Sequence, residues 1–234
     1  MLIRTRGIVF RSVKYGDTSF ISDIYTEAHG LRHFIIGGVR KAKSPTGTAL
    51  FQPGSALELV SYFRPDKNLH RIKEAKAGLI FRHIPLSIHK TAVQLFMAEL
   101  CSKTIKESEP NQPLFDFLWQ ALILLDKTQQ PVALLPHAFM CRLTAFLGFA
   151  PQTISGPADR FDTQSGHFSY SGTDKTGHID QLNKLFQSDF GDPLPEAISR
   201  ETRRAMMDTL MTYFAAHVAG FRKLNTPDIF GEIF

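Results

Sequence analysis

The chain has 234 residues, of which 43% are apolar and 21% charged, so it can bury a sizeable hydrophobic core. It contains no run of about 18 to 20 uncharged apolar residues, which argues against a membrane-spanning helix. The charged start MLIRTRGIVF is unlike a signal peptide. Both cysteines, Cys101 and Cys141, lie in apolar helical patterns, which is typical of reduced thiols in a cytoplasmic protein. A disulfide framework is therefore not expected.

The charge of the chain is unevenly distributed. Residues 1–80 hold 13 Lys and Arg against 6 Asp and Glu, a net charge of +7. Residues 81–234 hold 14 against 16, a net charge of −2. A segregated basic region indicates an anionic partner rather than a particular fold.

The first 80 residues read as short strands. Phe20, Ser22 and Ile24 alternate with Ile21, Asp23 and Tyr25, as expected of a strand. Further strands are predicted around Ile8 and Phe10 and over residues 31–36, 56–63 and 69–75, with a cation-rich loop at residues 40–47. Five strands in 80 residues suit an OB-type barrel. An SH3-like barrel has a similar strand count, so the count alone leaves both open.

After Pro85 the apolar period becomes helical. Helices are expected over residues 93–104, 115–125 and 135–147, with Pro110 and Pro113 breaking the chain between the first two and Gly148 capping the third. Residues 151–177 are rich in Gly, Ser, Thr and Asp and read as an irregular segment. A short helix over 179–190 and a long one over 199–221 follow. The predicted fold class is α+β, with a five-stranded OB-fold barrel at residues 1–80 and an all-α domain at residues 81–234.

Motifs for catalysis are missing from the sequence. It contains no phosphate-binding glycine loop, no G-x-S-x-G and no H-E-x-x-H. His29 and His33 lie across a predicted turn, and His167 and His178, with Asp162 and Asp174 nearby, lack a thiolate that would complete a zinc site. The sequence therefore predicts a protein that is not an enzyme and has no metal or other cofactor.

Cations and aromatic residues alternate along the basic region, as in an OB groove that binds strands of nucleic acid. Phe10, Tyr15, Phe34, Tyr62 and Phe63 supply the rings, although a small barrel fills its interior with such side chains. The candidate nucleic-acid-binding residues are Arg4, Arg6, Arg11, Lys14, Arg32, Arg40, Lys41, Lys43, Arg64 and Lys67.

Several segments, in order, resemble the RecO family of bacterial DNA repair and recombination mediators. Residues 6–12, Tyr15-Gly16-Asp17 and residues 25–30 resemble that family's opening strands, and residues 37–44 resemble its basic loop. Further on, Phe139, residues 147–151 and residues 224–226 resemble its third helix and closing tail. The likeness covers residues 3 to about 230, nearly the whole chain.

The resemblance implies an OB-fold followed by a helical domain. It also implies binding of single- and double-stranded DNA, annealing of complementary strands, and work with RecR and single-stranded DNA-binding protein to load RecA. Such a protein would be cytoplasmic and associated with the nucleoid. Many family members hold zinc through two Cys-x-x-Cys pairs after the third helix, but here residues 151–159 contain no cysteine. We expect hydrogen bonds and packing of Phe161, Phe168 and Tyr170 to hold this segment instead.

The resemblance further implies that the acidic, Phe-ending tail of single-stranded DNA-binding protein docks on the helices. Such a tail needs an apolar slot beside a cation for its carboxylate. The candidate partner-binding residues are Phe139, Arg142, Arg203, Arg204 and Arg222. The family's cation in the third helix falls here on a stretch occupied by His137 and Ala138.

Two other functions remain open from the residues alone. An RNA-binding OB protein would use the same groove, and comparing matched DNA and RNA oligonucleotides would separate it. A non-catalytic interaction scaffold would bind an acidic protein, and a steep salt dependence of oligonucleotide binding would argue against it.

Overall fold

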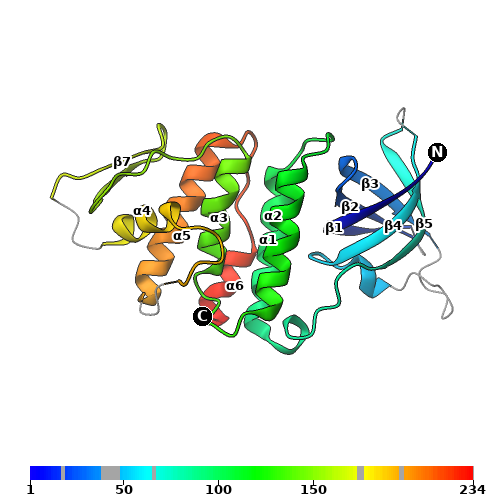
Figure 1. The fold of residues 1–234 in the computed structure, drawn as a ribbon, viewed down its shortest axis with the longest axis horizontal. Coiled ribbons are helices and arrows are strands. Elements are labelled where there is room, and N and C mark those ends of the chain that lie inside the picture. Colours follow the sequence, from blue (N-terminus) through cyan, green and yellow to red (C-terminus); the bar gives the residue numbers. More distant parts are fainter. Residues whose placement is uncertain (17–18, 38–47, 65–66, 173–176, 195–197, 234) are drawn as a thin grey trace. The chain divides into compact units, whose positions relative to one another are not determined.

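The computed structural model of the protein describes residues 1–16, 19–37, 48–64, 67–172, 177–194 and 198–233. The chain divides into two compact units, residues 1–127 and 128–234, and Figure 1 labels their α-helices and most of their strands. The first unit holds β1 (Leu2–Tyr15), β2 (Ser19–Thr26), β3 (Gly30–Ile36), η1 (Thr48–Phe51), β4 (Ala56–Tyr62), β5 (Leu69–Ala77), η2 (Ile84–Leu86), α1 (Ile88–Thr104) and α2 (Gln112–Lys127). The second holds α3 (Leu135–Phe146), β6 (Arg160–Asp162), β7 (His167–Ser169), α4 (His178–Gln187), α5 (Arg200–His217) and α6 (Thr226–Ile233).

The five N-terminal strands close into a barrel in the order β1-β2-β3-β5-β4. Only the β3–β5 pair in this barrel is parallel, and the other pairs are antiparallel. This closed barrel followed by helices confirms the expected fold class. The interior is filled by alternate side chains of the strands, among them Val9, Ile24, Phe34, Leu57 and Leu59, as a small barrel requires.

The outer face of β2 is also partly buried, which the simple alternation of its residues did not indicate. Tyr25 points away from the barrel core and is 1% exposed. Its ring stacks on Phe10 at 5.6 Å and on Phe115 of α2 at 6.3 Å. Helices α1 and α2 thus cover one side of the barrel, and they belong to the same compact unit as the barrel. The division at residues 80 and 81 stays a prediction about domain organisation.

Two local features fix α1 and α2 beside the barrel. The hydroxyl of Ser87 caps α1 by accepting a hydrogen bond from the amide of Lys90. The carboxylate of Asp126, near the end of α2, accepts hydrogen bonds from the amides of residues 82–84 at 2.9–3.1 Å. Pro113 does not break the chain as expected. It lies in the first turn of α2, where the missing N–H of proline costs nothing.

In the second unit α3 and α5 pack together with α4. Helix α3 ends as predicted, with Gly148 at a φ of +80°, a conformation that favours glycine. The prediction that residues 151–177 are irregular is wrong in part, because Arg160–Asp162 pairs with His167–Ser169 as an antiparallel ladder. Three-residue strands are too short to show a period of two in the sequence.

The C-terminal helices differ from the predicted ranges. Helix α4 ends at Gln187 rather than residue 190, and α5 ends at His217 rather than residue 221. Extended backbone at Val218 and a φ of +69° at Gly220 turn the chain away from the α5 axis. A further helix, α6, follows and was not predicted. None of the helices in the described ranges is long and apolar enough to cross a bilayer.

Candidate functional site

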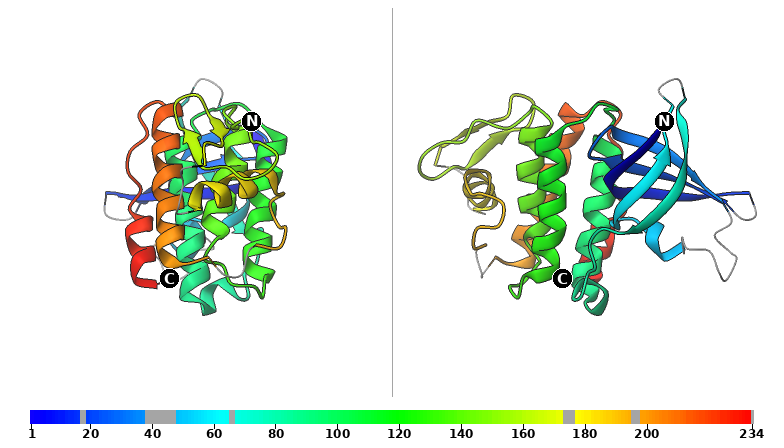
Figure 2. Two further views of the ribbon diagram at one scale, coloured as in Figure 1. Left: turned by 90° about the vertical axis from the view of Figure 1, so that its left-hand side faces the viewer. Right: turned by 45° about the vertical axis from the view of Figure 1, so that its right-hand side comes forward.

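A long β1–β2 arm extends beyond the barrel (Figure 2). Strand β1 pairs with β4 only over residues 2–8, whereas its pairing with β2 continues to Tyr15. We define the arm as residues 11–15 together with residues 19–23, of which residues 20–23 also pair with β3. Arg11, Val13, Lys14 and Tyr15 are all exposed on it. The arm therefore presents two cations and an aromatic ring that is 55% exposed.

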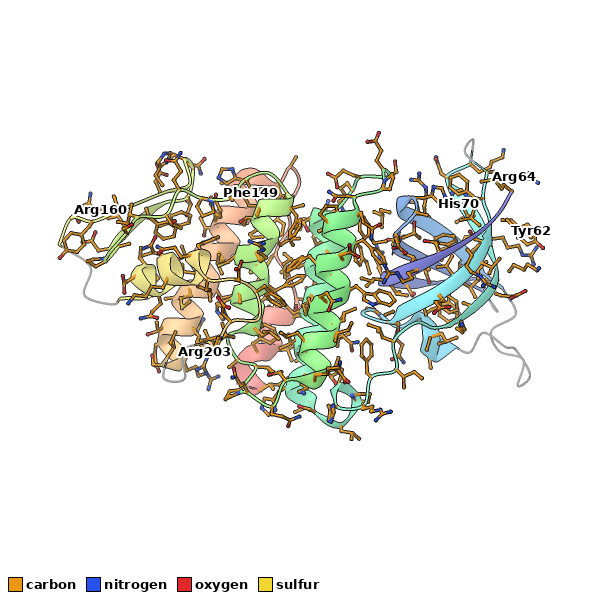
Figure 3. All side chains as sticks on the ribbon, in the orientation of Figure 1. Tyr62, Arg64, His70, Phe149, Arg160 and Arg203 are labelled. Atoms are coloured by element: carbon orange, nitrogen blue, oxygen red, sulfur yellow. The ribbon has the colours of Figure 1, made fainter. Side chains whose placement is uncertain are left out.

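A continuous row of outward side chains leads from this arm around the barrel wall. Strand register aligns Val13 with Ile21, Ile21 with Ile35, and Ile35 with Arg71. Arg71 in turn lies beside Tyr62 of β4. Figure 3 places Tyr62 and Arg64 at the outside of the barrel and His70 within it. This wall combines exposed rings with cations, and it includes the strand faces on which OB folds bind oligonucleotides.

The structure separates the candidate cations into three groups. Arg4, Arg11, Lys14, Arg64 and Lys67 are exposed on the barrel. Arg6 and Arg32 are half-buried, and their guanidinium groups make hydrogen bonds and ring contacts within the first unit. Arg40, Lys41 and Lys43 lie outside the described residues, so their assignment stays a prediction.

Arg6 is held against α2 and does not belong with the exposed cations. Its guanidinium donates to both carboxylate oxygens of Glu27, at 2.8 and 2.6 Å. It also lies 5.1 Å from the ring centroid of Phe115 and 5.0 Å from that of Trp119. The hydrogen bonds from Arg6 lower the pKa of Glu27. The position of Arg6 indicates that it fastens α2 to the barrel, an arrangement that strand patterning could not reveal.

Arg32 lies at one end of the barrel. Its guanidinium donates to the carbonyl of Leu31 at 3.1 Å and lies 5.8 Å from the ring centroid of Phe63. Burial lowers the pKa of Arg32, although an arginine keeps its charge at any physiological pH.

The second unit contains a groove of about 440 Å³ between α3, α5 and α6. Apolar residues of these elements and of the neighbouring segments line it: Ala133, Met207, Met211, Leu224, Pro227 and Phe230. Arg200, Arg203, Arg204 and Lys223 surround it, together with Asp208 and Asp228. His137 also lines the groove, and its Nε2 donates to the carbonyl oxygen of Arg203 at 2.9 Å. Burial lowers the pKa of His137 to about 4.

The candidate partner-binding residues fall in different places. Arg203 and Arg204 line the groove, whereas Arg142 and Arg222 do not. Arg142 instead lies 3.7 Å from Asp189 and 5.8 Å from the ring centroid of Phe146. Phe139 has no exposed surface and cannot contact a partner directly. Sequence reasoning missed the groove because it missed α6. Asn225-Thr226-Pro227-Asp228, a capping residue followed by proline and an acid, was the available signal for that helix.

The zinc implied for residues 151–177 does not fit the residues present. Nowhere in the described ranges do three or more His, Cys, Asp or Glu side chains gather in a way that could hold a metal ion. Nδ1 of His167 faces the carbonyl oxygen of Ser165 at 3.0 Å. Asp174 lies outside the described residues. Both cysteines are buried and free of disulfides.

Aromatic packing and a buried amide hold this segment. Phe161 stacks on Phe168 at 4.2 Å and meets Tyr213 edge-on at 4.9 Å. The buried side chain of Asn183 accepts from the amide of Ile154 at 3.1 Å and donates to its carbonyl at 2.9 Å. The expectation for Tyr170 was wrong, since its side chain is 63% exposed. A polar loop context did not indicate which of the three rings would turn inward.

Comparison with known proteins covers both units. Residues 1–80 match the family model described as recombination protein O N terminal, and residues 85–225 match recombination protein O C terminal. DNA repair protein RecO of Bacteroides fragilis (strain YCH46) is 33% identical over 247 residues, with 100% of both chains covered. DNA repair protein RecO of Phocaeicola vulgatus is 31% identical, and that of Christiangramia forsetii 30%, again over 100% of both chains.

Proposed function

The chain belongs to the recombination protein O family of DNA repair proteins, and on that basis we propose that it binds single- and double-stranded DNA and anneals complementary strands. We further propose that it works with RecR to load RecA onto single strands. None of these activities needs covalent chemistry, in keeping with the absence of catalytic motifs from the sequence.

The β1–β2 arm is the observation that carries this proposal. Arg11, Lys14 and Tyr15 are exposed on the part of β1 that continues past its pairing with β4, so their side chains are not part of the barrel core. Arg11 and Tyr15 share one face of the arm, where a phosphate can pair with the cation and a base can stack on the exposed ring. Lys14 lies on the opposite face and can pair with another phosphate of the strand. Arg4, Arg64 and Lys67 extend the cationic surface around the barrel.

Fluorescence anisotropy with a labelled oligonucleotide tests this proposal. The double variant Arg11→Ala/Lys14→Ala should reduce the log–log salt slope on single strands by about 0.7 for each phosphate that it no longer neutralises, or about 1.4 in all. Lys106→Ala/Arg160→Ala removes the same charge from exposed positions outside the barrel strands and serves as the control. An unchanged slope in the arm variant, or an equal reduction in the control, would count against the arm.

We also propose that the groove between α3, α5 and α6 takes the acidic, Phe-ending tail of single-stranded DNA-binding protein. The apolar residues that line it can pack against a phenylalanine ring, and its arginines can pair with a terminal carboxylate. Arg204 is exposed, and its side chain makes no hydrogen bond or ion pair with the described part of the chain. It is therefore the cation that we assign to the carboxylate.

Titration of a fluorescent peptide ending in Asp-Phe tests the groove. Arg204→Glu should weaken binding by at least about tenfold, the effect of removing one charge-assisted hydrogen bond. Arg142→Glu makes the same charge change outside the groove and should bind like the wild type. Weakened binding in Arg142→Glu alone would place the tail elsewhere.

Two comparisons separate this function from its alternatives. An RNA-binding protein would prefer RNA to a matched single-stranded DNA through its 2′-hydroxyl groups. An interaction scaffold would bind a mixed-sequence oligonucleotide without a steep salt dependence.

A further inference from the structure

A column of four rings rises from the barrel core to the surface at the end where β2 turns into β3. Phe34 and His70, each 2% exposed, form its base, and their ring centroids lie 5.8 Å apart. Phe63, 9% exposed, stacks on His70 at 4.8 Å and 15°. His29 stacks on Phe63 at 4.1 Å and 10° and is only partly buried. Exposure therefore increases from His70 to Phe63 and is greatest at His29, the outermost ring.

The histidines in this column serve as flat rings and not as hydrogen-bonding groups. Both ring nitrogens of His70 are buried without a hydrogen-bond partner in the described part of the chain, although an unpaired buried nitrogen costs roughly 1–3 kcal/mol. Burial, followed by the nearby charge of Arg32, lowers the pKa of both His29 and His70. The lowered pKa favours the neutral form of both rings.

His29, the outermost ring of the column, keeps part of its surface exposed. Among the described residues, no aromatic side chain other than Phe63 contacts His29. Arg32 lies beside the column, 5.8 Å from the Phe63 centroid, and the exposed Arg64 follows Phe63 in the chain. A flat, uncharged ring attached to an anion therefore matches this position, and a nucleotide has both parts.

We propose that His29 is a stacking platform for one unpaired nucleobase, with Arg32 and Arg64 facing the attached phosphates. This inference rests on the proposed DNA binding and adds to it a source of strand selectivity. Bases of a duplex are stacked on one another and cannot reach a ring at the barrel end, whereas bases of a single strand can turn out. The platform thus favours single strands, independently of the cations that hold any phosphate backbone.

The test compares a short oligothymidine with an abasic oligonucleotide of the same length and phosphate count. Stacking of one base on a protein ring changes affinity by about five- to 150-fold. In His29→Ala the preference for oligothymidine should fall at least about fivefold, while affinities for the abasic strand and for a duplex remain within about twofold of the wild type. His29→Phe keeps a flat ring and should retain the preference.

His33→Ala is the matched control. His33 is exposed on β3 and pairs with Asp23 at 2.7 Å, outside the ring column. An unchanged base preference in a folded His29→Ala protein, or an equal decrease in His33→Ala, would overturn the platform while leaving DNA binding intact. If the wild-type protein binds neither oligonucleotide nor duplex, the proposed function fails as well. Circular dichroism melts of all three variants establish that each is folded.

Discussion

Arg6 should matter for the stability of the barrel unit and not for its DNA contacts. The perturbation is Arg6→Ala, which removes a guanidinium that bonds both oxygens of Glu27 and covers the rings of Phe115 and Trp119. The side chains of Arg6 and Glu27 are 36% and 28% exposed. This is therefore a partly screened pair, and the energies of fully buried pairs do not apply to it.

The magnitude follows from these interactions. A well-oriented, partly exposed ion pair contributes about 1 kcal/mol, and each cation–ring interaction about 0.5–1 kcal/mol. Removal of all three should destabilise the unit by about 2 to 3 kcal/mol. For a unit spanning residues 1–127, that corresponds to a fall of about 7 to 11 °C in Tm.

Calorimetry of the full chain measures this effect, and a double-mutant cycle isolates the ion pair. Arg6→Ala combined with Glu27→Ala should show a coupling energy of about 1 kcal/mol. Arg11→Ala removes an exposed arginine of the same strand and should move Tm by less than about 2 °C. A shift below about 2 °C for Arg6→Ala, or a reduced salt slope of DNA binding without a decrease in stability, would refute the structural role of Arg6.

Three further outcomes are expected. A chelator should leave Tm unchanged, because rings and the Asn183 amide hold residues 151–177; about one zinc per chain by elemental analysis would contradict this. The pKa of His137 falls from about 6.5 in the unfolded chain to about 4 in the folded one. The neutral ring therefore contributes about 3 kcal/mol to the free energy of unfolding, which is fully present above pH 6.5 and is lost as pH falls toward 4. Urea unfolding whose free energy does not depend on pH in this way, or an equal dependence in His137→Asn, would refute this. The triple variant Arg40→Ala/Lys41→Ala/Lys43→Ala should reduce the log–log salt slope of DNA binding by roughly 2 to 3; a slope equal to that of the wild type would remove this loop from the interface.

The barrel could be predicted from the sequence because its strands alternate and its turns carry glycine. Contacts between elements could not be predicted in this way. Arg6 reads as one more cation on a basic strand until α2 brings Phe115 and Trp119 beside it. Phe63 was a candidate groove ring and His70 drew no prediction, and only the folded structure stacks both with His29 of a distant turn.

The helical region shows the same limit. The helical period over residues 199–221 predicts a buried stripe of Met206, Leu210, Tyr213, Phe214, His217 and Phe221. The first four are buried, whereas His217 and Phe221 are only half-buried. Arg142 was a candidate cation for a partner's carboxylate; it lies near Phe146, but Asp189 already pairs with it. The groove itself depends on α6, whose eight residues give too little periodicity to detect.

The most direct test of the proposed function is annealing of complementary strands coated with single-stranded DNA-binding protein. The wild-type chain should accelerate duplex formation, and Arg11→Ala/Lys14→Ala should lose most of that acceleration while Lys106→Ala/Arg160→Ala retains it. A folded wild-type protein that binds these strands no better than the arm variant, and does not accelerate their annealing, would contradict the proposal.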